Sequence, residues 1–265
     1  WSSDMAYVLG FLFADGNLNK EMTSLTINLA ASDDCILKHI NKEIKSKFPI
    51  TYSKGGIDKR GWKCRDQCHF GAYSKVLCEK LVELGIYPRK TYRDDPFPKH
   101  VPDDMLPHLL RGWFDGDGCV TFGNTRGYPY CHAFYIGSPL CMNGIRDILM
   151  RFAGMKYQKV MILHGKESDY AQVLWGADED IKKLRDFIYP KGFGFCLLRK
   201  KKRLDEWLTR EKKPRVHPFW TEEEIDKLKS CYYTLGSKRF AEEFGRNQQA
   251  VIAKAHKMGI SKKRS

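Results

Sequence analysis

The sequence has 265 residues, and 42% of them are hydrophobic, which is enough for a sizeable buried core. Lysine and arginine number 46 against 32 aspartates and glutamates, so the formal net charge is +14. No apolar run is long enough to cross a membrane, and no signal segment or lipidation motif is present. We therefore expect a soluble, intracellular protein with a polyanionic partner, such as nucleic acid, rather than a membrane.

The nine cysteines are scattered along the chain and mostly lie in apolar runs. This distribution is typical of reduced thiols in a cytosolic protein, and we expect no disulfide. Cys64, Cys68 and His69 could suggest a zinc site. No second ligand pair of suitable spacing follows them, so we do not assign zinc.

Two short segments share one pattern. Residues 8–16 and 110–118 are each an apolar helical run that ends in Asp-Gly, with small residues four positions apart. The small residues are Gly10 and Ala14 in the first segment, and Gly112 and Gly116 in the second. This spacing places them on one helix face, where a second backbone can approach closely. We expect the two helices to pack on each other and to bring Asp15 and Asp117 side by side.

The first half of the chain predicts alternating helices and strands. The opening helix should end at Gly16 in a left-handed conformation. The predicted elements are a helix at 3–14, a strand at 24–30, a helix from 32 that Pro49 stops, a hairpin of 50–52 with 63–73, and a helix at 74–84. The strand at 24–30 has three apolar side chains on one face, so it should be half-buried.

The second half repeats that order from its own Asp-Gly segment. It predicts strands at 119–122 and 130–136, a helix at 140–153, a hairpin of 156–164 with 170–175, and a helix at 177–189. A duplicated order of this kind predicts a tandem α+β fold. Prolines at 96, 98 and 102 mark the boundary between the halves. We expect domains at 1–98 and 99–211.

A charged break with two prolines at 209–218 separates a third predicted domain, 217–265. Thr221 and Glu224 form a capping box at the head of the first of three short helices. The arrangement predicts a helix-turn-helix bundle, and its opening Trp-Thr-Glu-Glu-Glu resembles the SANT/Myb-like class. The last helix would then present Arg246, Asn247, Gln248, Gln249, Lys254 and Lys257 to DNA. A protein-binding three-helix bundle is the alternative.

The paired segments resemble the LAGLIDADG signature of homing endonucleases. The matching positions are Gly10, Ala14, Asp15 and Gly16, then Gly112, Gly116, Asp117 and Gly118. The resemblance covers about residues 4–211 and implies two pseudo-symmetric αββαββα repeats whose antiparallel sheets bind DNA. It implies a monomeric enzyme that cleaves both strands of an asymmetric DNA site of about 20 base pairs or more, encoded in a mobile intron or intein-like element.

Hydrolysis of a phosphodiester requires charge neutralisation and an activated water, which divalent ions held by carboxylates supply. The resemblance implies that Asp15 and Asp117 bind Mg²⁺, with Mn²⁺ or Ca²⁺ as substitutes, helped by the backbone carbonyls of Ala14 and Gly116. A pair of helix-capping aspartates is the alternative, but the helix dipoles and mutual repulsion disfavour it. Asp115 has no acidic counterpart in the first segment, and we interpret it as a residue behind the site or on the surface.

The family places one lysine per repeat near the scissile phosphate, after the last helix of the repeat. Lys90 and Lys200 occupy matching places, so the resemblance implies that both are catalytic. The run 199–203 is strongly basic, which makes Lys201 and Lys202 rivals for Lys200. A solvated helix face or a phosphate clamp is the alternative for this run.

Polar side chains alternate with apolar ones along the predicted strands, and one face of each sheet should therefore carry donors for base edges and phosphates. These residues are Asn17, Asn19, Thr26, Asn28, Lys63, Arg65, Gln67 and His69 in the first repeat, and Thr121, Arg126, Tyr128, Tyr130, His132 and Gln172 in the second. A solvated sheet face is the alternative for any one of them.

Three functions are compatible with the sequence. The leading hypothesis is a site-specific DNA endonuclease with Mg²⁺ as its cofactor. A non-cleaving LAGLIDADG-like transcription regulator is one alternative, although such relatives usually lose the acidic positions. A maturase that binds structured intron RNA is the other.

Overall fold

The computed structural model describes residues 1–57, 59, 61–94, 97–98, 100–125, 128–165, 169–211 and 220–260. The chain divides into two compact units, Trp1–Glu211 and Lys212–Ser265. Among the described residues, helices fall short of the length and apolar character that a membrane crossing requires. All nine cysteines are free thiols.

The first repeat places a four-stranded antiparallel sheet beside three helices. Its elements are α1 (Ser3–Asp15), β1 (Asn17–Leu18), β2 (Ser24–Ala30), the 3-10 turn η1 (Ala31–Asp33), α2 (Asp34–Glu43), β3 (Thr51–Ser53), β4 (Gln67–Tyr73) and α3 (Lys75–Glu83). The strand order in this first sheet is β1-β2-β4-β3. Two further 3-10 turns, η2 (Lys90–Tyr92) and η3 (Asp103–Met105), lead to the second repeat.

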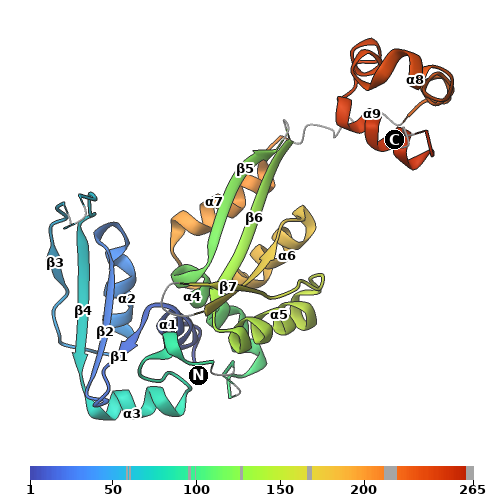
Figure 1. The fold of residues 1–265 in the computed structure, drawn as a ribbon. Coiled ribbons are helices and arrows are strands. Elements are labelled where there is room, and N and C mark those ends of the chain that lie inside the picture. Colours follow the sequence, from blue (N-terminus) through green and yellow to red (C-terminus); the bar gives the residue numbers. More distant parts are fainter. Residues whose placement is uncertain are drawn as a thin grey trace. The chain divides into compact units, whose positions relative to one another are not determined.

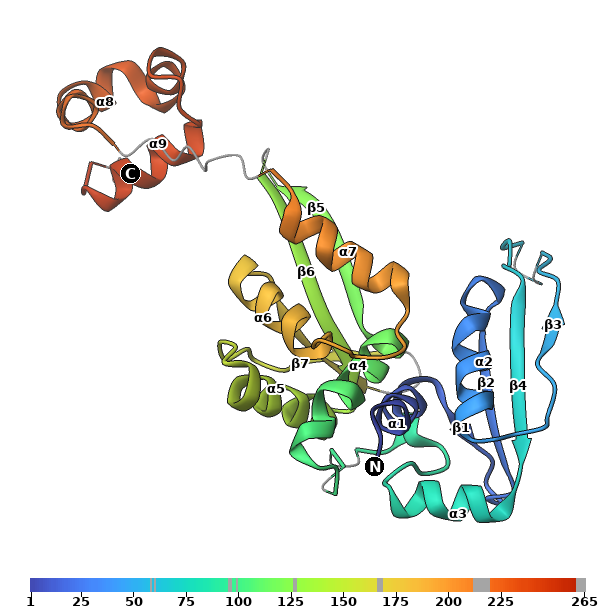
Figure 2. The same cartoon turned by 180° about the vertical axis from the view of Figure 1, so that it is seen from behind.

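The second repeat has the same order of elements. They are α4 (Leu106–Asp117), β5 (Cys119–Thr125), β6 (Tyr128–Gly137), α5 (Pro139–Ala153), β7 (Met161–His164), β8 (Asp169–Trp175) and α6 (Asp178–Ile188). The second sheet has the order β5-β6-β8-β7, which matches the first. An additional helix, α7 (Leu198–Thr209), follows and packs along β5 (Figure 2). The predicted α+β fold of two αββαββα repeats is confirmed.

The glycine faces of α1 and α4 pack directly on each other at the centre of the unit, between the two sheets (Figure 1). A Cβ added to Gly10 would lie 1.9 Å from the carbonyl oxygen of Leu109. A Cβ added to Gly112 would lie 2.0 Å from the carbonyl oxygen of Tyr7. Such contacts are possible only for glycine, and they confirm the predicted packing of the two helices.

Each sheet has one face covered by helices and one face that we call open. On the covered faces, alternate residues of β2, β4, β6 and β8 are buried: Leu25, Ile27, Cys68, Phe70, Ala133, Tyr135, Ala171, Val173 and Trp175. The helices α2 and α3 contact the first sheet, and α5 and α7 contact the second. Because side chains alternate along a strand, the residues between these belong to the open faces.

Two predicted strands begin later than we expected from the sequence. β4 starts at Gln67, whose partner Ala30 is the last residue of β2, so residues before Gln67 have no neighbouring strand there. Lys63 pairs only with Ile57, in an isolated bridge. β7 starts at Met161 rather than at 156. The preceding backbone is held instead by side chains, because the indole of Trp175 donates to the carbonyl of residue 156.

The expectation that Gly16 is left-handed was also wrong. Its φ is −71° and its ψ is 138°, which is extended backbone. Glycine is required there for space instead, because a Cβ would lie 2.6 Å from the carbonyl oxygen of Leu12. The chain can therefore turn sharply from α1 into β1 directly after Asp15.

The second unit contains α8 (Glu222–Glu243) and α9 (Gln248–Lys257). α8 is broken at Gly236, where φ is 74° and ψ is 159°, so the unit has three helical segments among its described residues. Its small core consists of Leu228, Phe240, Ala241, Val251 and Ala255. The predicted capping box of Thr221 and Glu224 is present.

Candidate active site

Two half-buried aspartates, Asp15 and Asp117, end the central helices α1 and α4. A Cβ on Gly116 would lie 3.1 Å from a carboxylate oxygen of Asp15, so the end of α1 touches the backbone of α4. Burial raises the pKa of both carboxyl groups. The pKa of Asp117 rises to about 6, and the negative charge of Asp15 contributes to this shift. The two carboxylates therefore form a local concentration of negative charge that favours a cation.

Each helix end is capped by one lysine. The Nζ of Lys90 donates hydrogen bonds to the carbonyl oxygens of Leu12 at 2.9 Å and Phe13 at 2.6 Å, and to that of Ala14. The carbonyl of Leu12 also accepts from the N–H of Gly16 at 3.0 Å. All three carbonyls belong to the last turn of α1 and form the negative end of its dipole. Burial lowers the pKa of Lys90 to about 8, while the charges of Asp117 and Asp15 oppose that shift.

Lys200 caps α4 in the same way. Its Nζ donates to the carbonyl oxygens of Phe114 at 2.8 Å, Gly116 at 2.7 Å and Gly118 at 2.6 Å. Burial lowers its pKa, and the charges of Asp115, Asp15 and Asp117 raise it. The site therefore holds two carboxylates and two ammonium groups, arranged as two similar halves.

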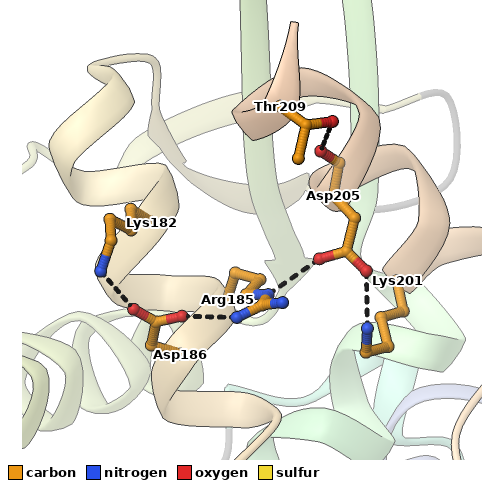
Figure 3. Close-up of polar contacts among 6 residues, drawn as sticks. All are labelled: Lys182, Arg185, Asp186, Lys201, Asp205 and Thr209. Carbon is orange, nitrogen blue, oxygen red and sulfur yellow. Dashed lines mark hydrogen bonds and ion pairs between the residues drawn. The ribbon is translucent and has the colours of Figure 1, made fainter.

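The structure distinguishes Lys200 from its neighbours in the basic run. Lys201 binds Asp205 at 2.6 Å, and Asp205 also accepts from Arg185 of α6 at 2.8 Å. Figure 3 shows this chain of contacts, which continues through Asp186 to Lys182. Lys201 thus holds α7 on α6 and does not reach the end of α4.

The other basic residues beside Lys200 also lie away from the helix end. Lys202 is exposed on α7. Arg199 forms a bidentate ion pair with Asp33 of the first repeat, with distances of 3.1 and 2.7 Å. In this run, only Lys200 points at the carbonyls of α4.

Asp115 is buried, so of the two positions that we expected for it, behind the site or on the surface, the structure has the first. Only 2% of Asp115 is exposed. Its Oδ2 accepts from the hydroxyl of Tyr7 at 2.9 Å and from the backbone N–H of Leu197 at 2.6 Å. Burial raises its pKa to about 6. Asp115 therefore ties the segment that leads into α7, and hence Lys200, to α4 and α1.

Arg111 is a buried residue that sequence reasoning missed. Its guanidinium donates to the carbonyl oxygens of Phe195 at 2.9 Å, Ile188 at 3.1 Å and Phe193 at 2.5 Å. An arginine and an aspartate four positions apart within an apolar helix were the available signal, because buried charges need partners. The first repeat has the apolar Leu9 and Phe13 at the corresponding positions.

The open face of the first sheet collects most of the polar residues predicted there. The side-chain amide of Asn17 donates to the hydroxyl of Thr26 at 3.2 Å. The ring of His69 contacts the amide oxygen of Asn28 at 2.8 Å and the hydroxyl of Ser53 at 2.8 Å. Gln67 pairs with Ser53 on the same face. This face is therefore a connected polar surface.

Three of the predicted first-repeat residues lie elsewhere. The side-chain oxygen of Asn19 accepts from the N–H groups of Thr23 and Ser24, both at 2.8 Å, so Asn19 closes the turn between β1 and β2. Lys63 and Arg65 are exposed, but they precede β4 and do not continue its row.

In the second sheet, four of the predicted residues belong to the open face: Thr121, Tyr130, His132 and Gln172. Thr121 and His132 are directly paired across β5 and β6. Arg126 lies outside the described residues, and the side chain of Tyr128 is likewise not described.

In the C-terminal unit, Arg246 is not available as a DNA contact. Its guanidinium binds Glu224 with distances of 2.6 and 2.5 Å, and it lies 4.3 Å from the ring centre of Trp220. Lys254 is half-buried beside the same ring. The remaining predicted residues, Asn247, Gln248, Gln249 and Lys257, are exposed.

The Arg246–Glu224 pair predicts an acid-sensitive C-terminal unit. Bonding to Arg246 lowers the pKa of Glu224 to about 2 from an ordinary value of 4.5. A lowered pKa of Glu224 stabilises the folded state above pH 4.5, and this stabilisation disappears as the pH falls toward 2.

We expect Arg246→Ala to lower the free energy of unfolding of the C-terminal unit by about 3 kcal/mol, because it leaves the buried carboxylate of Glu224 without its charged partner. Hydrogen exchange of residues 220–260 in the full chain measures the loss, and Arg239→Ala is the control.

Comparison with known proteins places this geometry in a known fold. No protein-family model and no curated protein sequence matches the chain. Among solved structures, the homing endonuclease I-WcaI bound to its DNA recognition sequence is similar, with a TM-score of 0.51 and 11% identity. The alignment covers 77% of this chain and 88% of that chain. The chain has the LAGLIDADG fold.

Two further LAGLIDADG-fold structures align with lower scores. The LAGLIDADG homing endonuclease I-GzeII in complex with its DNA target has a TM-score of 0.49 and 14% identity, covering 89% of this chain and 95% of that chain. Full-length DUF199/WhiA from Thermatoga maritima has a TM-score of 0.42 and 14% identity, covering 97% and 89%. At such identities the likeness concerns the fold, and function depends on the site.

Proposed function

We propose that this protein is a site-specific DNA endonuclease that hydrolyses both strands of a long asymmetric duplex. The observation that carries the proposal is the pair of half-buried aspartates, Asp15 and Asp117, with a lysine beside each helix end. The net charge of +14 and the polar open face of the first sheet support a DNA partner. The similar fold of I-WcaI, which was solved on DNA, supports it as well.

The residues at the helix ends fit a divalent cation such as Mg²⁺, with Mn²⁺ or Ca²⁺ as substitutes. Carboxylate oxygens are the ligands that such ions prefer. Burial and the negative charge of Asp15 together raise the pKa of Asp117, and a bound cation would offset both effects. The carbonyls of Ala14 and Gly116 accept from lysines, but each carbonyl has a second lone pair. When bound, the ion would neutralise charge on the phosphate and activate water.

The side chains at the two helix ends would then form two similar halves of the site, each of which cleaves one DNA strand. Asp15 with Lys90, and Asp117 with Lys200, would each serve one DNA strand. Each lysine holds positive charge beside the carboxylates, where it can stabilise the negative charge that develops on a phosphate. Because the lysines are held by backbone carbonyls, their ammonium groups are already oriented before substrate binds.

The C-terminal unit would add DNA contacts through α9, in the manner of a helix-turn-helix domain. Asn247, Gln248, Gln249 and Lys257 are exposed for this role. Together with the two sheets, this unit would extend the recognised site to about 20 base pairs or more.

Cleavage of DNA by the full chain with Mg²⁺ tests the proposal, using a randomised duplex library. We expect Asp15→Asn and Asp117→Asn each to abolish double-strand cleavage but to retain DNA binding, because each variant removes a cation ligand without removing a basic residue. The exposed Asp147→Asn on α5 is the matched control and should cleave normally. Ca²⁺ should raise the Tm of the wild type and not that of the double variant.

Two results would overturn the proposal. Tight DNA binding without cleavage in Mg²⁺ or Mn²⁺ would indicate a transcription regulator. Selective binding of structured RNA over duplex DNA would indicate a maturase.

A further inference from the structure

The two sheets have equivalent strand pairing but very different open faces. Thr26 pairs with Asn17 at the start of β1, and Phe134 pairs with Cys119 at the start of β5, so Thr26 and Phe134 are counterparts. The pairing along the remaining strands extends this correspondence. In the second sheet it yields six residues that we call the apolar patch: Phe134, Ile136, Met161, Leu163, Tyr170 and Leu174.

The counterparts of the apolar patch in the first sheet are mostly polar. They are, in the same order, Thr26, Asn28, Thr51, Ser53, Gln67 and Gly71. Among them, Asn28 and Ser53 are joined through hydrogen bonds to the ring of His69. The first sheet therefore presents donors and acceptors where the second presents hydrocarbon.

The apolar patch is accessible and is not part of the core. Met161 is 42% exposed and Tyr170 is 39% exposed, and the other four residues are half-buried. The residues between them on the same strands, such as Tyr135 and Val173, are fully buried against the helices. Gln172, which pairs with both Ile136 and Met161, is a polar residue that lies among the residues of the apolar patch. An accessible surface that is mostly apolar marks a binding site.

The apolar patch continues into the candidate active site. Ile136 and Tyr170 line the same cavity, of about 310 Å³, as Lys90 and Asp117. Whatever lies against Lys90 and Asp117 therefore also lies close to the apolar patch. Under the proposed function, that occupant is the DNA duplex.

We propose that the second sheet recognises the 5-methyl groups of thymines in the base pairs nearest the cut. This inference rests on the proposed function. In the major groove each base pair presents hydrogen-bonding atoms, and the thymine methyl is the apolar group that distinguishes A·T from G·C. Phe134, Ile136 and Leu174 can contact methyl groups but cannot pair with donors or acceptors. The first sheet, by contrast, reads its half-site through hydrogen bonds from residues such as Asn28.

Replacing thymine by uracil tests this inference, because the exchange removes only the methyl group. A duplex is first selected by binding to the full chain, and then thymines are replaced by uracils in one half-site at a time. We expect one half-site to lose affinity by about fourfold for each contacted methyl, measured in Ca²⁺. The other half-site should change by less than about twofold. Equal responses of the two half-sites would overturn the inference.

A double variant tests whether the second sheet causes the discrimination between thymine and uracil. Phe134→Thr with Ile136→Asn installs the residues that the first sheet has at the same positions. We expect this variant to bind thymine- and uracil-containing duplexes equally, while Asn28→Ala keeps the wild-type discrimination. Discrimination that survives in the double variant contradicts the inference. Circular dichroism checks that the double variant is folded.

Binding and cleavage separate the two proposals. Methyl discrimination without cleavage in Mg²⁺ would support recognition of thymine by the apolar patch and would overturn the endonuclease proposal. Cleavage without methyl discrimination would support the endonuclease proposal and would overturn the role of the apolar patch. Failure to bind any duplex, or a preference for RNA, which lacks the thymine methyl, would overturn both.

Discussion

Replacing Gly112 by alanine is expected to destabilise the unit Trp1–Glu211 by at least about 3 kcal/mol. The added Cβ would lie 2.0 Å from the carbonyl oxygen of Tyr7 and 2.8 Å from the backbone nitrogen of Phe11. These are backbone atoms of a packed helix, so they cannot rotate away as a flexible side chain would. Relief requires α1 and α4 to separate, which opens the core and pulls Asp15 and Asp117 apart. Thermal unfolding followed by circular dichroism measures the effect.

A matched glycine provides the control for this result. Gly56 has no atom within 4 Å of an added Cβ, so Gly56→Ala should leave the Tm nearly unchanged. Gly10→Ala should behave like Gly112→Ala, because its Cβ would lie 1.9 Å from the carbonyl oxygen of Leu109. A Gly112→Ala protein with the Tm of the wild type would show that the helices are not packed as described.

The second large effect is expected for Lys200→Met. This change removes the ammonium group that the carbonyls of Phe114, Gly116 and Gly118 hold beside Asp117. Under the proposed function, we expect cleavage of one DNA strand to slow by about 10²- to 10³-fold, as when a preorganised donor is lost. The other strand should be cut at nearly the normal rate by the half that contains Lys90. Duplexes labelled on either strand separate the two rates.

Lys201→Met is the matched control for the lysine prediction. Lys201 is adjacent in sequence, but it binds Asp205 and has no contact with the end of α4. We expect it to leave both strand rates within about threefold, because it alters only a partly exposed ion pair. Equal slowing of both strands by Lys200→Met would contradict the division of the site into two halves. A larger effect from Lys201→Met than from Lys200→Met would show that Lys201, and not Lys200, is the catalytic lysine.

The sequence by itself determined the features that depend on local periodicity. Two glycines at the right helical positions, Gly10 and Gly112, predicted close helix packing, because spacing along a helix dictates which residues share a face. The order of apolar runs and turns occurs twice along the chain, and this duplication predicted the two repeats. The meeting of Asp15 and Asp117 followed directly, since both residues end the helices that pack.

Only the tertiary structure decided which of several similar basic residues lies at the candidate site and which forms an ion pair elsewhere. Lys200 and Lys201 are equivalent in sequence, and they differ because α7 turns one toward α4 and the other toward Asp205. The sequence predicts Arg246 as a DNA contact, but in the structure its guanidinium binds Glu224. In both cases the choice depends on a partner distant in the sequence or on the direction of a helix.

The open faces show the same limit at the scale of a sheet. Alternation predicted that Tyr130 and His132 of β6 would share a face, since alternation is a property of a single strand. It could not reveal that Phe134, Ile136 and Leu174 form one apolar patch with Met161, because that depends on strand pairing. Local patterns thus determined the elements and their faces, whereas long-range pairing decided which side chains meet.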